Sequence, residues 1–413
     1  MNRWWIILAG TILQLCLGTV YAWSYFQKPL VETYGWSNSN VSLTFSLTIC
    51  FLGLAAAWGG TQLPRFGPRK LAVAGGLLFG LGYLLAAVAL HYHSLALLYV
   101  GYGVVGGSGL GLGYVTPVAT VAKWFPDKKG LATGTVIMGF GFGALLMSKQ
   151  IAPMLVDYCH KDFVAVFAWL GVVLGGATSL VALFLCNPPI APAGDAQQRR
   201  PQHDAAPAKF PVAQFVLMWS VFFCNIVAGI SIISFQSPLL QNLWKARDPA
   251  ATAEMLAVYG ANLIAVSSLL NGLGRMFWGG LSDRLGRLAT FRLMLASQVA
   301  VFALLAMTGN PWLFAALVCY VLLCYGGGFG TMPSFVLDEF GPKRMAAVYG
   351  AMLTAWSAGG MAGPQLVAFL TDHYGPAASR YTFTAAGVIV TLGFLLTLAI
   401  RPAAKPAGNT SNG

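Results

Sequence analysis

The sequence predicts an all-α integral membrane protein with twelve transmembrane helices in two pseudo-symmetric halves of six helices each. Of the 413 residues, 57% are hydrophobic and only 9% are charged, whereas soluble domains carry about 25% charged residues. The apolar residues form continuous runs of about 20 residues or more, which is the length that a helix needs to cross about 30 Å of hydrocarbon. One polar, proline-rich stretch divides these runs six and six.

The composition argues against several other classes. A membrane β-barrel would show short segments of alternating apolar and polar residues. The net charge of +12 does not indicate nucleic-acid binding, because the basic residues cluster in short loops between the runs. The seven cysteines include no C-x-x-C pair and predict neither a disulfide framework nor a metal site. Without a catalytic or nucleotide-binding motif, we expect neither an enzyme nor a cofactor.

The expected spans follow the apolar runs in order. They are 5–26, 41–62, 71–90, 95–122, 130–153, 163–186, 211–237, 255–281, 289–308, 311–335, 345–371 and 380–400. The first run continues through Phe26 without a small-residue cleavage site, so we expect a retained span and no signal peptide. Residues 187–210 contain five prolines among polar residues and predict a flexible linker. The predicted domains are therefore two six-helix bundles, 1–186 and 211–400, followed by a disordered tail, 401–413.

The loop charges predict the orientation in the lipid bilayer. With the N-terminus inside, most of the 24 basic residues fall on the inner side, in the linker and in the loops that follow the even-numbered spans. Lysine and arginine favour cytoplasmic loops. We therefore expect a multi-pass protein of the inner (plasma) membrane, with both termini and the linker in the cytoplasm.

A short motif recurs after the second and the eighth span. GTQLPRFGPRK runs from Gly60 to Lys70, and GGLSDRLGR runs from Gly279 to Arg287, at an offset of 219 residues. A carboxylate at one helix end can bind the N-terminus of a neighbouring helix and pair with arginine. Such a latch would stabilise one state of a gate, and its candidate residues are Arg65, Gly67, Asp283, Arg284 and Gly286. The first copy has Pro64 in place of the aspartate.

This motif resembles the signature loop of the major facilitator superfamily. The strings VYAWSYF at 20–26 and WFPDKKGLATG at 124–134, together with an arginine in the eighth span, are similar to the oxalate:formate antiporter family, which is close to the monocarboxylate transporters. The resemblance implies a secondary transporter, and parallel six-helix repeats place the substrate site at their interface near the bilayer midplane.

Arg275 is the leading candidate for substrate binding. It lies inside the apolar run 255–281, where an arginine costs about 2.5–3.5 kcal/mol on insertion scales. Asn271 lies one turn earlier on the same face. An intramembrane arginine indicates an anion site, and the alternative is a side chain that reaches the cytoplasmic edge near Ser282. Subtracting the repeat offset gives Ala56, so the repeated architecture does not require the arginine.

Aromatic residues are the other candidates for the site. Tyr114 follows a glycine-rich run and Tyr325 precedes Gly326, and glycine beside an aromatic residue allows helices to approach closely around a small cavity. The resemblance implies that aromatics on these helices face the substrate, and further candidates are Phe329 and Trp356. Lys28 resembles the first-span lysine of monocarboxylate transporters. It is either an outer docking cation, with a possible role in proton coupling, or a lysine that reaches the membrane surface.

The eleventh span favours a monocarboxylate. The oxalate transporter of the family resembled has a second cation there, whereas this span has none from Tyr349 to Pro364. A lysine introduced at Ser357 is expected to shift the preference toward dicarboxylates. We expect a lactate- or pyruvate-like anion, moved with a proton by alternating access, in a carrier that is a monomer and binds no nucleic acid. The alternative is one-for-one anion exchange, because Asn271 replaces the titratable aspartate that monocarboxylate transporters have at this position.

Overall fold

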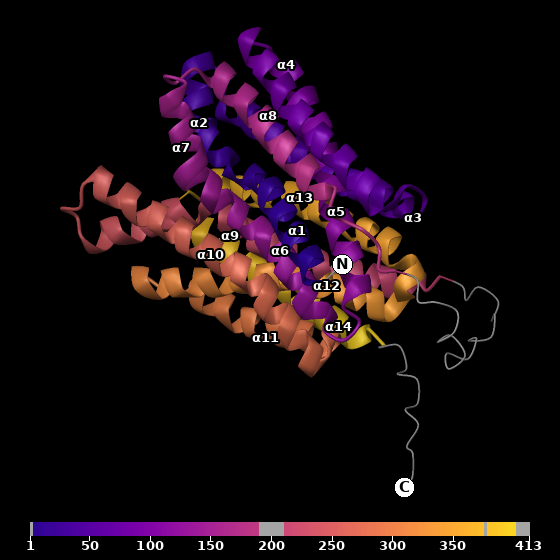
Figure 1. Cartoon of the computed structure of the whole chain (residues 1–413). Coiled ribbons are helices and arrows are strands. Elements are labelled where there is room, and N and C mark those ends of the chain that lie inside the picture. Colours follow the sequence, from indigo (N-terminus) through magenta and orange to yellow (C-terminus); the bar gives the residue numbers. More distant parts are fainter. Residues whose placement is uncertain (1–2, 190–209, 376–377, 402–413) are drawn as a thin grey trace, which may run out of the picture.

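The structure is a computed structural model that describes residues 3–189, 210–375 and 378–401, without the side chains of a few residues in these ranges. Regular secondary structure in these ranges consists of helices. In Figure 1 the indigo to magenta helices of the first half lie mostly in the upper part of the view, and the orange to yellow helices of the second half lie mostly below them.

The first half contains several spans that are interrupted by irregular turns. Its elements are α1 (Arg3–Gly18), η1 (Thr19–Ala22), α2 (Trp23–Tyr34), α3 (Asn38–His91), α4 (Leu95–Leu98), η2 (Tyr99–Gly106), α5 (Gly107–Trp124), α6 (Lys129–Leu146), η3 (Met147–Ile151), α7 (Ala152–Tyr158) and α8 (Phe163–Ala182). Side-chain caps start three of the helices: Ser37, Ser94 and Asp162 each accept a hydrogen bond from a backbone N–H of the following turn. These polar residues at the ends of apolar runs fix where the helices begin.

The second half consists of longer, more continuous helices. They are α9 (Val212–Arg247), α10 (Ala253–Leu285), α11 (Arg287–Leu305), α12 (Pro311–Met352), α13 (Thr354–Tyr374) and α14 (Ala378–Ala399). Thr252 caps α10 and Asn310 caps α12. Several helices extend beyond the predicted spans. The helix α9, for example, continues to Arg247, because its polar last turns can stand outside the hydrocarbon.

Two long helical segments each account for two spans. Within the described residues, ten segments are long and apolar enough to cross a membrane, and two of them are 52 and 57 residues long. Gly67 (φ 75°) and Gly341 (φ 76°) interrupt these two segments in the left-handed region that glycine adopts without strain. Counting each interrupted segment as two gives the twelve predicted spans. We call the end of the bundle that carries the turns at Gly67, Pro126, Gly286 and Gly341 the basic end.

The two halves meet along a seam lined by glycine. A Cβ on Gly134 of α6 would collide with the carbonyl of Arg275 on α10, and a Cβ on Gly350 of α12 would collide with the carbonyl of Ala56 on α3. The two pairs are related by the offsets of the sequence repeat: Gly350 lies 216 residues after Gly134, and Ala56 lies 219 residues before Arg275. The seam is therefore pseudo-symmetric in its backbone, and Ala56 is the symmetry counterpart of Arg275.

Candidate functional site

Arg275 lies at the seam, and its side chain is 0% exposed. Its Nη1 donates a hydrogen bond to the carbonyl of Ile137 on α6, at 3.2 Å, so this bond crosses from one half to the other. Within the described part of the chain, Nε and Nη2 have no hydrogen-bond partner. An arginine is always charged, and a buried charge without full hydrogen bonding is costly. The guanidinium therefore presents an unpaired positive edge inside the protein.

Six aromatic rings surround this guanidinium, and we call them the aromatic box. The rings belong to Tyr21, Tyr114 and Phe140 in the first half and to Tyr325, Phe329 and Trp356 in the second half. The Arg275 Cζ lies 5.5 Å from the ring centroid of Phe140 and 5.2 Å from that of Phe329. Such geometry gives a cation–π attraction, which offsets part of the cost of burying the charge.

The rings also pack against one another across the seam. The centroid of Trp356 lies 5.4 Å from Tyr114, 5.7 Å from Phe140, 5.9 Å from Tyr21 and 4.7 Å from Phe329. These edge-to-face and tilted pairs are the arrangements that aromatic quadrupoles prefer. The box is thus a well-packed structure that holds the guanidinium in place from both halves.

Polar atoms of the box also lack partners. Buried oxygens of Tyr21, Tyr114 and Tyr325, the hydroxyl of the neighbouring Tyr349, and Nε1 of Trp356 have no hydrogen-bond partner of good geometry among the described residues. The hydroxyls of Tyr21 and Tyr325 approach each other, as do those of Tyr114 and Tyr349. Each of these four hydroxyls also interacts electrostatically with Arg275. Phenols and indoles that are buried usually find a partner. A small anion with several oxygens would supply the acceptors.

The structure brings most of the predicted residues together. Arg275, Tyr114, Tyr325, Phe329 and Trp356 all belong to the guanidinium and its box, and each is 0% exposed. The arginine thus does not reach the membrane surface.

Other predicted residues lie elsewhere or remain untested. Asn271 is nearly buried one turn from Arg275, but it packs against Gly326 of α12, and its Oδ1 has no partner in the described part of the chain. Lys28 falls in α2, and its side chain lies outside what the structure describes. Ser357 points away from the box, since its hydroxyl donates to the carbonyls of Ile49 and Cys50 on α3. The effect of a lysine at Ser357 on the preference for dicarboxylates stays a prediction, and the structure places this position against α3.

Phe140 and Tyr349 belong to the site but were absent from the predicted set. Each stands beside glycine, Phe140 in the string GFGFG and Tyr349 before Gly350. This is the same signal that selects Tyr114 and Tyr325, and applying it to every span would have found both residues.

The predicted latch is present at the basic end, with one different arginine. Asp283 accepts hydrogen bonds from the backbone N–H groups of Gly130 and Leu131, both at 2.9 Å, at the N-terminus of α6. A carboxylate at this position satisfies free N–H groups and complements the helix dipole. The paired cation is Arg287, at 2.6 Å, whereas Arg284 is exposed and forms no ion pair found among the described residues.

A second acidic residue extends this latch. Asp338 of α12 pairs with Arg287 at 2.9 Å and, across the seam, with Lys129 of α6 at 2.9 Å. In the first copy of the motif, Gly67 turns the chain as Gly286 does. Arg65 lies over the ring of the exposed Phe66, at 5.3 Å, and Pro64 offers no carboxylate. The latch across the seam therefore forms at the second copy of the motif, whereas the first copy, with Pro64, lacks the carboxylate for it.

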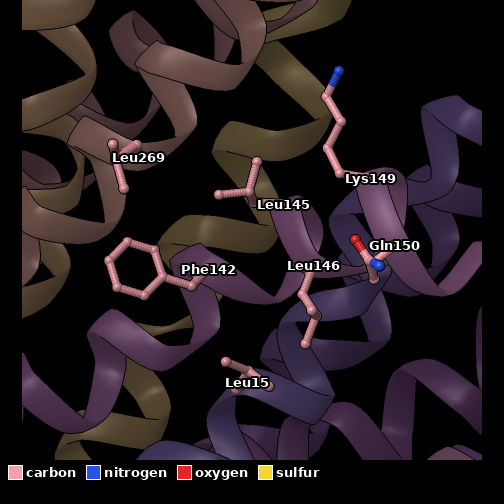
Figure 2. A pocket seen from close by; sticks show the side chains of 7 residues that line it. All are labelled: Leu15, Phe142, Leu145, Leu146, Lys149, Gln150 and Leu269. Atoms are coloured by element: carbon pink, nitrogen blue, oxygen red, sulfur yellow. The ribbon is translucent and has the colours of Figure 1, made fainter.

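A groove on the outside of the protein does not qualify as the site. It has a volume of about 410 Å³ and lies between α1, α6, η3 and α10. Figure 2 shows its lining of Leu15, Phe142, Leu145, Leu146 and Leu269, with Lys149 pointing away from these apolar side chains. Apolar surface of this kind suits lipid contact.

Comparison with known proteins identifies the family. The model of the Major Facilitator Superfamily matches residues 7–364 and 255–413. The chain belongs to this superfamily. Its fold is the superfamily's fold: a solved structure of the proton:xylose symporter XylE superposes with a TM-score of 0.73 over 97% of this chain and 96% of the other, at 14% identity.

Three relatives place the chain within the superfamily. The Oxalate:formate antiporter of Oxalobacter formigenes is 26% identical over 91% of this chain and 86% of its own. Apicoplast pyruvate carrier 1 of Toxoplasma gondii is 26% identical, covering 84% and 80%, and the human Monocarboxylate transporter 11 is 25% identical, covering 98% and 84%. The chain is therefore a multi-pass membrane transporter of the superfamily, related to oxalate:formate and monocarboxylate carriers, and not an enzyme.

Proposed function

We propose that the protein is a secondary transporter that moves a small monocarboxylate, of the lactate or pyruvate kind, together with a proton by alternating access. The observation that carries this proposal is the buried guanidinium of Arg275, with two of its three nitrogens unpartnered among the described residues, at the seam between the halves. A carboxylate matches this fork with two charge-assisted hydrogen bonds. The names of the related carriers support an organic acid as the substrate.

The charge of the box supports a monocarboxylate. Arg275 carries the positive charge of the site, since the six rings of the box and the neighbouring Tyr349 are neutral. The charge of a second carboxylate would therefore stay uncompensated in a medium of low dielectric constant. The box is also lined by large rings, so it suits a molecule of few atoms. The tyrosine hydroxyls offer hydrogen bonds to further neutral oxygens of the substrate.

Net uptake of the anion is favoured when a proton moves with it and cancels its charge. The box itself contains no acid that could carry this proton. Without a proton, inward movement of an anion is opposed by about 2.3 kcal/mol per 100 mV of negative-inside potential. Asn271 cannot titrate, so the proton would travel on the substrate or on Lys28. The same lack of an acid favours the second candidate function, one-for-one anion exchange, in which no proton is required.

The membrane arrangement is also a proposal. We infer that the basic end faces the cytoplasm, because lysine and arginine concentrate in its loops. The two bundles, 1–186 and 211–400, then rock about the seam as a monomer in the inner membrane, joined by the cytoplasmic linker 187–210 and followed by the tail from Arg401.

Proteoliposomes separate symport from exchange. Uptake of labelled pyruvate that is driven by an inward pH gradient, without internal anion, supports symport. Uptake that requires an internal anion and ignores the gradient establishes exchange and removes the proposed coupling.

Competition tests the substrate class in the same vesicles. Pyruvate and lactate are expected to inhibit uptake at much lower concentrations than oxalate. Inhibition by oxalate at concentrations comparable to those of the best monocarboxylate would refute the charge argument.

A further inference from the structure

The aromatic box is closed by a thick barrier on the side of the basic end. Below it, Gly130 packs so closely on Gly279, and Gly60 on Ala346, that a Cβ on any of these glycines would overlap backbone atoms of the other half. The Asp283 latch lies beyond these contacts. Backbone therefore lies against backbone over several turns, and opening this side requires the halves to separate.

The barrier on the other side is thin. Tyr21 lies about 27 Å along the first span from Arg3, which is fixed at the basic end by its ion pair with Asp127. The ring of Tyr21 reaches across the seam to Trp356, at 5.9 Å, and also lies against Phe140, at 5.1 Å. Tyr21 is only half-buried, although its hydroxyl is buried. Trp356, directly beneath it, is 0% exposed. Beside it, Ile49 of α3 also crosses the seam, against Gly360 of α13. Tyr21 is thus the half-buried ring that covers Trp356 on this side.

The backbone at Tyr21 is built differently from that of the helices around it. Tyr21 lies in η1, a single 3₁₀ turn (Thr19–Ala22) between α1 and α2. A short 3₁₀ stretch within a long helix often marks a hinge. On one side of this turn, α1 packs against α5, α6 and α8, and a Cβ on Gly18 would collide with the backbone of Phe140. On the other side, the backbone of α2 lies mainly against α3, and its Trp23 and Phe26 rings pack on Phe167 of α8, all within the same half. The backbone before η1 is therefore packed against three helices, and the segment after it is held mainly through side chains of its own half.

We propose that Tyr21, carried on the η1 turn, is the gate that closes the aromatic box on the side away from the basic end. The Tyr21 ring covers Trp356 and the route to Arg275. Its hydroxyl faces Tyr325 of the other half. Swinging α2 and η1 about the end of α1 removes this single ring and admits solute while the thick barrier stays shut. The inference concerns the site of the proposed function and rests on that function, because a gate serves only a site that exchanges solute.

Oxidation by hydroxyl radicals, followed by residue-resolved mass spectrometry, tests the gate in nanodiscs without any carboxylate. The readout is the labelling of Trp356. Tyr21→Ala is expected to raise it several-fold over wild type. Two matched variants are expected to leave it unchanged: Tyr25→Ala, one turn further along the first span, and Phe340→Ala, at the basic end beside the turn at Gly341. Tyr83, 2% exposed in the core of the first half, reports whether a variant has unfolded.

Unchanged labelling of Trp356 in Tyr21→Ala, or an equal rise in Phe340→Ala, would overturn the proposal. If Tyr83 becomes labelled in Tyr21→Ala, the milder Tyr21→Leu decides by the same criterion. Because no substrate is present, this result is independent of whether Arg275 binds a monocarboxylate. If the proposed function itself is wrong, the sign would be a different one: an Arg275→Ala variant would bind pyruvate normally.

Discussion

Replacing Asp283 by alanine is expected to shift the protein away from the state that is closed at the basic end. Asp283 makes three contacts, but its ion pair with Arg287 lies within the second half and survives opening. The two hydrogen bonds from the N–H groups of Gly130 and Leu131 cross the seam and are lost on opening. Of the three contacts of Asp283, these two are the ones that distinguish the closed state from the open one.

The magnitude follows from those two bonds. Each joins a backbone N–H to an ionised carboxylate, and such bonds contribute about 1.5 kcal/mol each at the low end of their range. The low end is appropriate because the side chain of Asp283 is 16% exposed and water can replace part of the interaction. The sum of about 3 kcal/mol corresponds to a shift of roughly a hundredfold in the ratio of closed to open molecules.

Distances between spin labels measure this ratio. Labels at Lys128 and Leu285, two exposed positions on opposite sides of the seam, report the separation of the halves at the basic end. Asp283→Ala is expected to move the distance distribution toward long values. Arg284→Ala is the matched control, because this adjacent side chain is exposed and pairs with no described residue. An unchanged distribution in Asp283→Ala, or the same shift in Arg284→Ala, would refute the reasoning.

Three further predictions concern the seam and the box. Gly134→Val is expected to open the basic end and abolish transport, because the valine side chain would collide with the backbone of Arg275 in the other half. Its control is Gly176→Val, where a Cβ meets nothing within 4 Å, and this variant should leave spin-label distances and uptake unchanged. Tyr114→Phe and Tyr325→Phe should each raise the KM for pyruvate by roughly two- to tenfold, the effect of one lost hydrogen bond, without lowering thermal stability, since neither hydroxyl has a hydrogen-bond partner of good geometry among the described residues. An unchanged KM would contradict the proposed role. Trp356→Lys, which places a second cation in the box, should increase inhibition of uptake by oxalate relative to pyruvate, and an unaltered ratio would count against the charge argument.

The fold and the central cation could be predicted because their signals are strong in a single sequence. Twelve apolar runs are long enough to be counted, and a charged residue such as Arg275 inside one of them is costly enough to require a reason. The latch at Asp283 was also foreseeable, since the motif repeats at a fixed offset. The motif alone leaves the paired cation open, because Arg284 and Arg287 both follow the aspartate, and helix geometry places the residue at i+4 beside it.

The faces of the helices could not be predicted in the same way. Trp356 and Ser357 are neighbours, but successive side chains on a helix are about 100° apart, so Trp356 enters the box while Ser357 faces α3. The helix is also interrupted at Leu353, just before these residues, which removes the periodicity from which their direction could be read. Phe140 likewise lies in an almost uniformly apolar span, where hydropathy does not distinguish the lipid side from the seam.

Calorimetry of pyruvate binding to purified wild-type and Arg275→Ala protein tests the central claim most directly. Wild type is expected to bind pyruvate, and the variant is expected to lose at least about 3 kcal/mol of binding free energy, or roughly a hundredfold in Kd, because the carboxylate loses its charged fork. Arg275→Lys should recover only part of this loss, since an ammonium group cannot reproduce the planar pair of hydrogen bonds. Equal affinity in wild type and Arg275→Ala, with Arg284→Ala as the control for surface charge, would contradict the account.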